Sequence, residues 1–134
     1  MEVGPDRLVD RLGPDEPPYR SRGEAQIGRL LDRFGFPFVY EQSTIVLDRG
    51  GRYRIWHPDF CLPEYNGAII EYAGMPDVPH YMAGIGRKQM IYRANHIPAI
   101  FLFPEDLQGP RWPERAIERV RRLGLPRYSE IGSS

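Results

Sequence analysis

Two acidic residues interrupt apolar stretches in the middle of this 134-residue chain. Asp59 lies within "WHPDFCL", and Glu71 follows twelve residues later within "GAIIEYAG". Two carboxylates that are buried side by side repel each other, and burying either one without a partner is costly. A divalent cation removes that cost, and oxygen ligands of this kind favour Mg²⁺ or Mn²⁺. The pair therefore predicts a metal site, provided that the fold brings the two residues together.

The elements that carry these residues are predicted from hydrophobic spacing and turn residues. The expected order is helix, three strands, helix, strand, helix, at residues 21–35, 36–48, 52–62, 67–74, 81–95, 98–103 and 112–123. The first three strands form an antiparallel meander, and the fourth joins the third through a right-handed parallel crossover. We therefore expect an α/β fold with a mixed four-stranded sheet flanked by helices.

Alternation of side chains along a strand decides whether the carboxylates can meet. It places on one face of the second strand Tyr53, Ile55, His57, Asp59 and Cys61, and on one face of the third strand Ile69, Glu71 and Ala73. If the two strands pair, Asp59 and Glu71 lie close together on one side of the sheet. Two alternatives stay open: Asp59 serves a turn after Pro58, or Glu71 sits at a wet strand end. A purely structural domain would have the two carboxylates facing apart.

Composition limits the class of protein. Lys+Arg and Asp+Glu both number 18, so there is no global basic field, and any site for a polyanion has to be a local patch. The single cysteine, Cys61, is incompatible with an intramolecular disulfide framework and suits a reducing, cytoplasmic setting. No apolar run reaches the roughly 20 residues of a membrane span, and the acidic N-terminus is no signal peptide. We expect an irregular arm at residues 1–20 and a single domain at residues 21–134.

Lys88 is the only lysine in the chain, because the other seventeen basic residues are arginine. It shares one stripe of the helix predicted at residues 81–95 with Tyr81, Ile85 and Tyr92. A lysine on a packed stripe either snorkels to water or serves chemistry. Arginine would snorkel equally well, whereas it reproduces poorly a compact ammonium beside an attacking water. We therefore favour a functional role for Lys88.

Glu24 allows two interpretations. It stands three residues after Ser21, the spacing of a capping box at a helix start. It also lies on the apolar stripe with Ile27 and Leu31, which faces the sheet. The sequence does not separate a cap from a residue of the metal site.

Other residues are weaker candidates. Arg49, Arg52 and Arg54 cluster about a predicted hairpin and could meet phosphates. Tyr65 could stack on a base or simply pack. The three histidines have no ligand-like spacing with one another or with the cysteine, which argues against zinc.

Pro58-Asp59 followed by Glu71 in "AIIEYAG" resembles the signature of the PD-(D/E)xK nucleases, the restriction-endonuclease-like superfamily. The predicted α-β-β-β-α-β order matches that superfamily's core. The resemblance covers about residues 21–107 and leaves the last helix, about residues 112–123, outside it.

The chain departs from the common signature at one position. The superfamily's lysine stands two residues after the Glu, where this chain has Ala73. One branch moves the lysine to the following helix in a pattern like "EYxG…Y…K…Y". This chain is similar to that branch, with Tyr72 and Gly74 after Glu71 and then Tyr81, Lys88 and Tyr92.

The resemblance implies a Mg²⁺- or Mn²⁺-dependent deoxyribonuclease of DNA repair, recombination or restriction. Asp59, Glu71 and the backbone carbonyl of Tyr72 would hold the metal, Lys88 would orient or help deprotonate the attacking water, and Glu24 would bind a second ion or its water. The implied partner is DNA, and a homodimer or a helicase-like protein are further partners that this branch allows. The alternative is a catalytically silent nucleic-acid-binding or protein-docking module on the same fold, which a solvent-directed Lys88 would favour.

Overall fold

The computed structural model describes residues 16–124. Its helices are α2 (Arg22–Arg33), α3 (Pro79–Ala94) and α4 (Trp112–Leu123). Its strands are β1 (Val39–Tyr40), β2 (Thr44–Leu47), β3 (Tyr53–Trp56), β4 (Phe60–Leu62), β5 (Ala68–Tyr72) and β6 (Ala99–Leu102). Two short 3₁₀ turns, η1 (Pro63–Tyr65) and η2 (Pro104–Leu107), follow β4 and β6.

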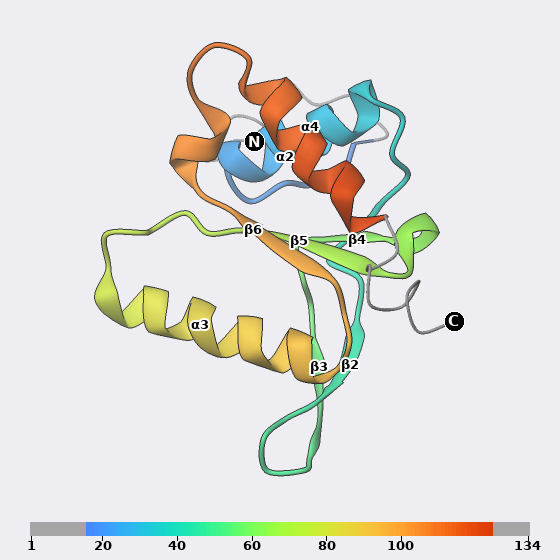
Figure 1. Cartoon of the computed structure of the whole chain (residues 1–134), viewed down its shortest axis with the longest axis vertical. Helices are drawn as coiled ribbons and strands as arrows, with labels where there is room; N and C mark the ends of the chain where they lie inside the picture. Colours follow the sequence, from blue (N-terminus) through green and yellow to red (C-terminus); the bar gives the residue numbers. More distant parts are fainter. Residues whose placement is uncertain (1–15, 125–134) are drawn as a thin grey trace, which may run out of the picture.

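A mixed four-stranded sheet in the order β1-β4-β5-β6 forms the centre of the fold. The pairs β1–β4 and β4–β5 are antiparallel, and β5–β6 is parallel through the crossover helix α3. Helices α2 and α4 cover one face of this sheet and α3 covers the other (Figure 1). The expected mixed α/β architecture is therefore confirmed.

The first two predicted strands are each interrupted. Their outer parts, β2 and β3, pair with each other as a separate two-stranded sheet that extends beyond the main one (Figure 1). The interruptions face each other, at residues 41–43 and 57–59. Glu41 has a left-handed backbone, with a φ of 56°, and Pro58 lacks the N–H that a continuous ladder needs.

The interruption also overturns the expected common face of the second strand. Trp56 packs against the residue cluster on the α3 side of the sheet, and Cys61 packs against the same cluster. An odd and an even position cannot share a face in a regular strand, so the irregular residues 57–59 shift the alternation by one. The predicted alignment of Tyr53 and Ile55 with Cys61 is therefore wrong, and both Tyr53 and Ile55 are exposed.

The two faces of the sheet carry cores of different size. The larger core joins α2 and α4 to the sheet through Ile27, Leu31, Phe60, Ile70, Leu102, Ile117 and Val120. The smaller core, under α3, is made by Ile69, Ala73, Ile85, Tyr92 and Phe101. The stripe predicted on the crossover helix thus faces the sheet as expected.

The folded domain begins before residue 20. Of the predicted arm, residues 1–15 lie outside the described residues, but Tyr19 is buried in the larger core. Its ring lies against α2 at Gly28, where any side chain would collide with it. Within the described range, no helix has the length and apolar character that spanning a membrane requires.

Candidate functional site

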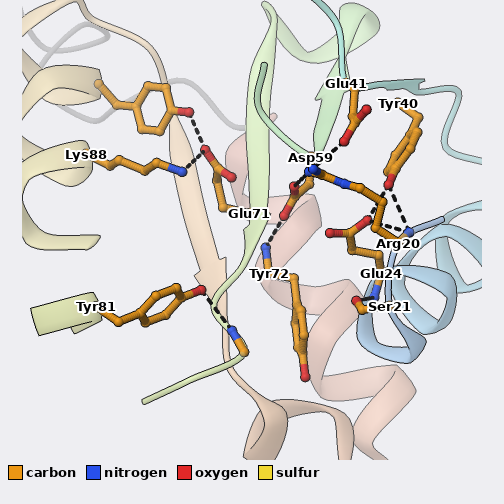
Figure 2. Close-up of polar contacts among 12 residues, drawn as sticks. Arg20, Ser21, Glu24, Tyr40, Glu41, Asp59, Glu71, Tyr72, Tyr81 and Lys88 are labelled. Atoms are coloured by element: carbon orange, nitrogen blue, oxygen red, sulfur yellow. Dashed lines mark hydrogen bonds and ion pairs between the residues drawn. The ribbon is translucent and has the colours of Figure 1, made fainter. Parts of the chain in front are cut away.

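Three carboxylates are the buried charged or polar side chains among residues 16–124. Glu24 and Asp59 are each 7% exposed and Glu71 is 4% exposed. They lie at one end of the main sheet, where α2 and β4 begin and β5 ends (Figure 2). The structure thus buries at this end of the sheet the three acidic residues that the sequence singled out.

Asp59 and Glu71 are neighbours across two paired strands. Phe60 is the register partner of Ile70, so Asp59 is level with Glu71 at the next position. The Tyr72 N–H donates a hydrogen bond to Oδ2 of Asp59 at 2.7 Å. The backbone of β5 therefore fixes the Asp59 carboxylate at the level of Glu71. The two carboxylates face different elements, since Glu71 contacts Lys88 of α3 and Asp59 contacts Arg20 before α2 (Figure 2). The common face of the sheet that was predicted for them is therefore not observed.

Glu71 is held by residues of α3, and we call Glu71, Lys88 and Tyr92 the Glu71 half of the site. The Tyr92 hydroxyl donates to Oε2 of Glu71 at 2.5 Å, and Nζ of Lys88 lies 3.5 Å from the same oxygen. The Lys88 side chain is 43% exposed, so its ammonium is accessible to solvent and to a bound molecule. Oε1 of Glu71 takes no hydrogen bond from the part of the chain that the structure describes.

The position two after Glu71 has a packing role. Ala73 is buried in the smaller core, which leaves no room there for a long side chain. The Gly74 N–H donates to the Tyr81 hydroxyl at 3.1 Å, which ties the end of β5 to the start of α3 (Figure 2). Lys88 then approaches Glu71 from the helix.

Asp59 is surrounded by a different set of residues, and we call Asp59, Arg20, Glu24, Tyr40 and Glu41 the Asp59 half of the site. Nη2 of Arg20 lies 3.9 Å from Oδ1 of Asp59 and 2.6 Å from Oε2 of Glu41. The Tyr40 hydroxyl and the Arg20 N–H, the latter at 3.2 Å, both donate to Oε1 of Glu24. Figure 2 shows Arg20 lying across the Asp59 and Glu41 carboxylates.

Sequence reasoning missed Arg20 and Tyr40. Arg20 stands in the segment that was expected to be an arm. Tyr40 belongs to a strand whose pairing was predicted, but the sequence analysis did not assign its side chains to a face of the sheet. No local pattern marks either residue. Only the contact of β1 and the start of α2 with Asp59 identifies them.

Glu24 was predicted either to complete a capping box or to belong to the metal site, and its backbone and side chain divide between the two. Its backbone N–H donates to Oγ of Ser21 at 3.1 Å, so Ser21 caps α2. The reciprocal bond of a capping box, from the Ser21 N–H to the Glu24 carboxylate, is replaced by the bond from Arg20. Gly23 allows the Tyr72 ring to pack against α2, because any side chain there would collide with that ring. The Glu24 carboxylate thus points to the site and is not needed for the cap.

The site carries surplus negative charge. Burial, together with the Glu71 and Glu24 carboxylates, raises the pKa of Asp59 from 3.8 to about 7, against the opposing effects of the Tyr72 N–H and of Lys88. Burial and the neighbouring Glu71 also raise the pKa of Tyr92, and burial and Glu24 raise that of Tyr40. Both tyrosines therefore stay protonated donors.

Two strand carboxylates, Asp59 and Glu71, are the candidate side-chain ligands for a divalent cation. Each of the two strand carboxylates has one oxygen held by a protein donor, Oδ2 of Asp59 and Oε2 of Glu71. The other oxygens, with the surplus charge, suit Mg²⁺ or Mn²⁺. Within residues 16–124 no three His, Cys, Asp or Glu side chains are grouped to hold a metal, so Glu24 does not complete a three-carboxylate site. A ligand role for the Tyr72 carbonyl stays a prediction.

The weaker candidates have different positions. Arg49 and Arg52 are exposed at the β2–β3 hairpin, whereas Nε of Arg54 is 2.8 Å from Oδ2 of Asp48. Tyr65 packs against Phe36, with the ring centroids 5.4 Å apart. It follows the last residue of β4, whereas Asp59 precedes the first residue of that strand. Tyr65 is therefore a packing residue and does not line the site.

Comparisons with protein-family models, with curated proteins and with solved structures find no match to this chain.

Proposed function

We propose that this protein is a metal-dependent nuclease that hydrolyses phosphodiester bonds of DNA. The observation that carries the proposal is the position of Lys88, whose ammonium is 3.5 Å from a buried glutamate that is level with Asp59 on the adjacent strand. Two carboxylates for a metal and one compact cation beside them are the groups that metal-assisted phosphodiester hydrolysis needs.

The Asp59 and Glu71 carboxylates, with the Tyr72 carbonyl, would hold Mg²⁺ or Mn²⁺. The ion would supply polarisation of the scissile phosphate and stabilisation of the leaving oxygen. The Tyr72 N–H and the Tyr92 hydroxyl would keep the two carboxylates oriented, since each holds one carboxylate oxygen.

Lys88 would orient the attacking water by a hydrogen bond from its ammonium. The water oxygen would form a bond to phosphorus and release a proton to solvent. The bond from phosphorus to the leaving oxygen would break, and that oxygen would take up a proton from solvent. Lys88 can do this because its ammonium is tied to Glu71 on one side and exposed on the other. A fully buried Lys88 ammonium would be out of reach of the substrate.

A place for this chain in the PD-(D/E)xK superfamily, in the branch with the lysine on the following helix, belongs to the same proposal. It is supported by the sheet order, by the register of β4 against β5, and by the approach of Lys88 to Glu71 in place of a lysine at position 73. The closeness of Lys88 to Glu71 also favours an active enzyme over a silent module.

The test is a Mn²⁺-dependent digestion of single-stranded, duplex and branched DNA by the wild-type protein and by Asp59→Ala. Asp77→Ala is the matched control, because Asp77 is an exposed aspartate outside the site. We expect cleavage by wild type and Asp77→Ala, and none by Asp59→Ala. Cleavage that survives in Asp59→Ala, or its absence from wild type on all three substrates, would overturn the proposal.

A further inference from the structure

Three hollows lie against α3 and share Lys88, and we call them together the α3 groove. The first, of 420 Å³, lies between the β2–β3 hairpin and the helix, with Arg49, Trp56 and Arg87 in its walls. The second, of 260 Å³, joins Trp56 to Glu71. The third, of 270 Å³, runs from Glu71 toward the start of α3. The groove thus leads from the hairpin past the Glu71 half of the site.

The walls of the α3 groove carry more positive than negative charge. Arg49, Arg87 and Lys88 line it, and His57 and His80 stand at its second and third hollows. Its acidic residues are Asp48, which is paired with Arg54, and Glu71 of the site itself. In a chain with no net charge, this local excess fits a polyanion.

An aromatic ring stands among these cations. Trp56 lines the first two hollows, and its ring is held edge-on against Tyr92 with the centroids 5.4 Å apart. A ring fixed in this way offers a stacking surface for a base at little cost in side-chain freedom. A groove that binds single-stranded nucleic acid has two parts. Its cations contact the phosphates of the nucleic-acid backbone, and its aromatic rings stack on the bases.

A glycine keeps the groove open. Gly84 lines the first and third hollows, in the middle of α3, where glycine destabilises a helix by about 0.5–1 kcal/mol relative to alanine. The nearest atom to an added Cβ there is the far end of the Arg87 side chain, at 3.7 Å. Packing therefore does not require the glycine, and a long side chain at this position would enter the first and third hollows.

We infer that the α3 groove binds single-stranded nucleic acid, with phosphates on Arg49 and Arg87 and a base on Trp56. The inference rests on the proposed nuclease function, because the bound nucleic-acid strand would pass Glu71 of the proposed site. A duplex fits these observations poorly, because its bases stay stacked inside it and it offers the wall only phosphates. The first hollow, of 420 Å³, also has the size of a site for a small ligand, which suits a single nucleotide.

The test measures binding without cleavage. Fluorescence anisotropy in EDTA would compare labelled oligo-dT and oligo-U of about ten nucleotides with a duplex of equal length. The decisive variant is Gly84→Gln, which places a side chain in the groove and leaves the carboxylates untouched. Gly86→Gln is the matched control, since Gly86 lies on the same helix, has no atom near an added Cβ and lines none of the three hollows.

We expect oligo-dT or oligo-U to bind more tightly than the duplex, and Gly84→Gln to weaken that binding by roughly tenfold or more while Gly86→Gln leaves it unchanged. Arg49→Ala and Arg87→Ala should each lower the slope of log affinity against log salt by about 0.7. Tighter binding of the duplex, or equal affinities of the Gly84→Gln and Gly86→Gln proteins, would overturn the inference. Binding through the groove by a protein that cleaves no DNA would overturn the nuclease proposal alone.

Discussion

The Glu71 half and the Asp59 half of the site hold similar carboxylates in different ways. Glu71 is held from one element, by Tyr92 and Lys88 of α3, and the Tyr92 ring is itself buried in the smaller core. The partners of Asp59 come from the segment before α2 and from β5, and the Arg20 side chain is 65% exposed. Glu71 is thus held by a buried tyrosine and a half-exposed lysine, and the charge of Asp59 is balanced by an exposed arginine.

This difference suggests a division of labour. The pair of Arg20 and Asp59, at 3.9 Å, contributes little stability because the Arg20 side chain is largely exposed and water screens its charge. The Asp59 half therefore keeps uncompensated negative charge, which would attract the metal of the proposed nuclease. The Glu71 half instead presents a positioned ammonium, which suits the attacking water. Four changes test this division, from the largest expected effect to the smallest.

Lys88→Ala should remove most cleavage and leave metal binding intact, because lysine is no ligand for a cation. The loss of a group that positions the nucleophile costs on the order of 10² to 10⁴ in rate. Lys88→Arg should also be poor, since a planar guanidinium cannot take the place of a compact ammonium. Single-turnover cleavage rates measure both, with Arg93→Ala on the same helix as the control. An unchanged rate in Lys88→Ala would show that the ammonium has no part in the reaction.

Asp59→Asn should weaken Mn²⁺ binding by about tenfold or more with little loss of folding, because it removes a charge from a hard-oxygen site. Isothermal titration calorimetry measures the affinity, and Asp77→Asn serves as the exposed control. If the Asp59→Asn protein binds Mn²⁺ as tightly as wild type does, the metal is not held by the Asp59 half.

The metal-free protein should lose stability as the pH rises from about 4 to about 7. Burial raises the pKa of Asp59 to about 7 in the folded protein, so the folded state keeps a proton that the unfolded state has released. This contribution is complete below pH 4 and lost above pH 7, with a slope of at most about 1.4 kcal/mol per pH unit.

Urea unfolding in EDTA at several pH values measures this effect as the difference between wild type and Asp59→Asn. Added Mg²⁺ should restore stability to wild type near neutral pH, since it neutralises the ionised carboxylate. Parallel stability curves for the two proteins would mean that Asp59 ionises normally in the fold.

Glu24→Gln should slow cleavage by no more than about tenfold while the melting temperature barely changes. The amide oxygen can still accept from Arg20 and Tyr40, and the Ser21 cap uses the backbone N–H, which remains. Only the negative charge near Asp59 is lost. A rate within error of wild type would assign Glu24 to structure alone, and a clear fall in melting temperature would show that its charge supports the fold.

The sequence predicted the arrangement of the main sheet because each of its signals is local. Each signal depends on residues only a few positions apart in the sequence. Examples are the run at residues 68–72, the turn at Asn66-Gly67 and the helical stripe with Ile85 and Tyr92. The pairing of β4 with β5 follows from the short connection between them, and it sets Asp59 level with Glu71. The interruption of the second strand was not visible, because Pro58 alone does not say how far a ladder continues.

By itself, the sequence determined the acids, their spacing, and the side of the crossover helix that carries Lys88. Period-2 and period-3.6 patterns suffice for that, since both arise from backbone geometry. Only the tertiary structure decided that Arg20 and Tyr40 join the site, that Glu24 turns its carboxylate toward Asp59, and that the hairpin and α3 form a groove. These contacts link residues far apart in the chain through packing of whole elements, and no local pattern of residue types encodes which side chains such packing brings together.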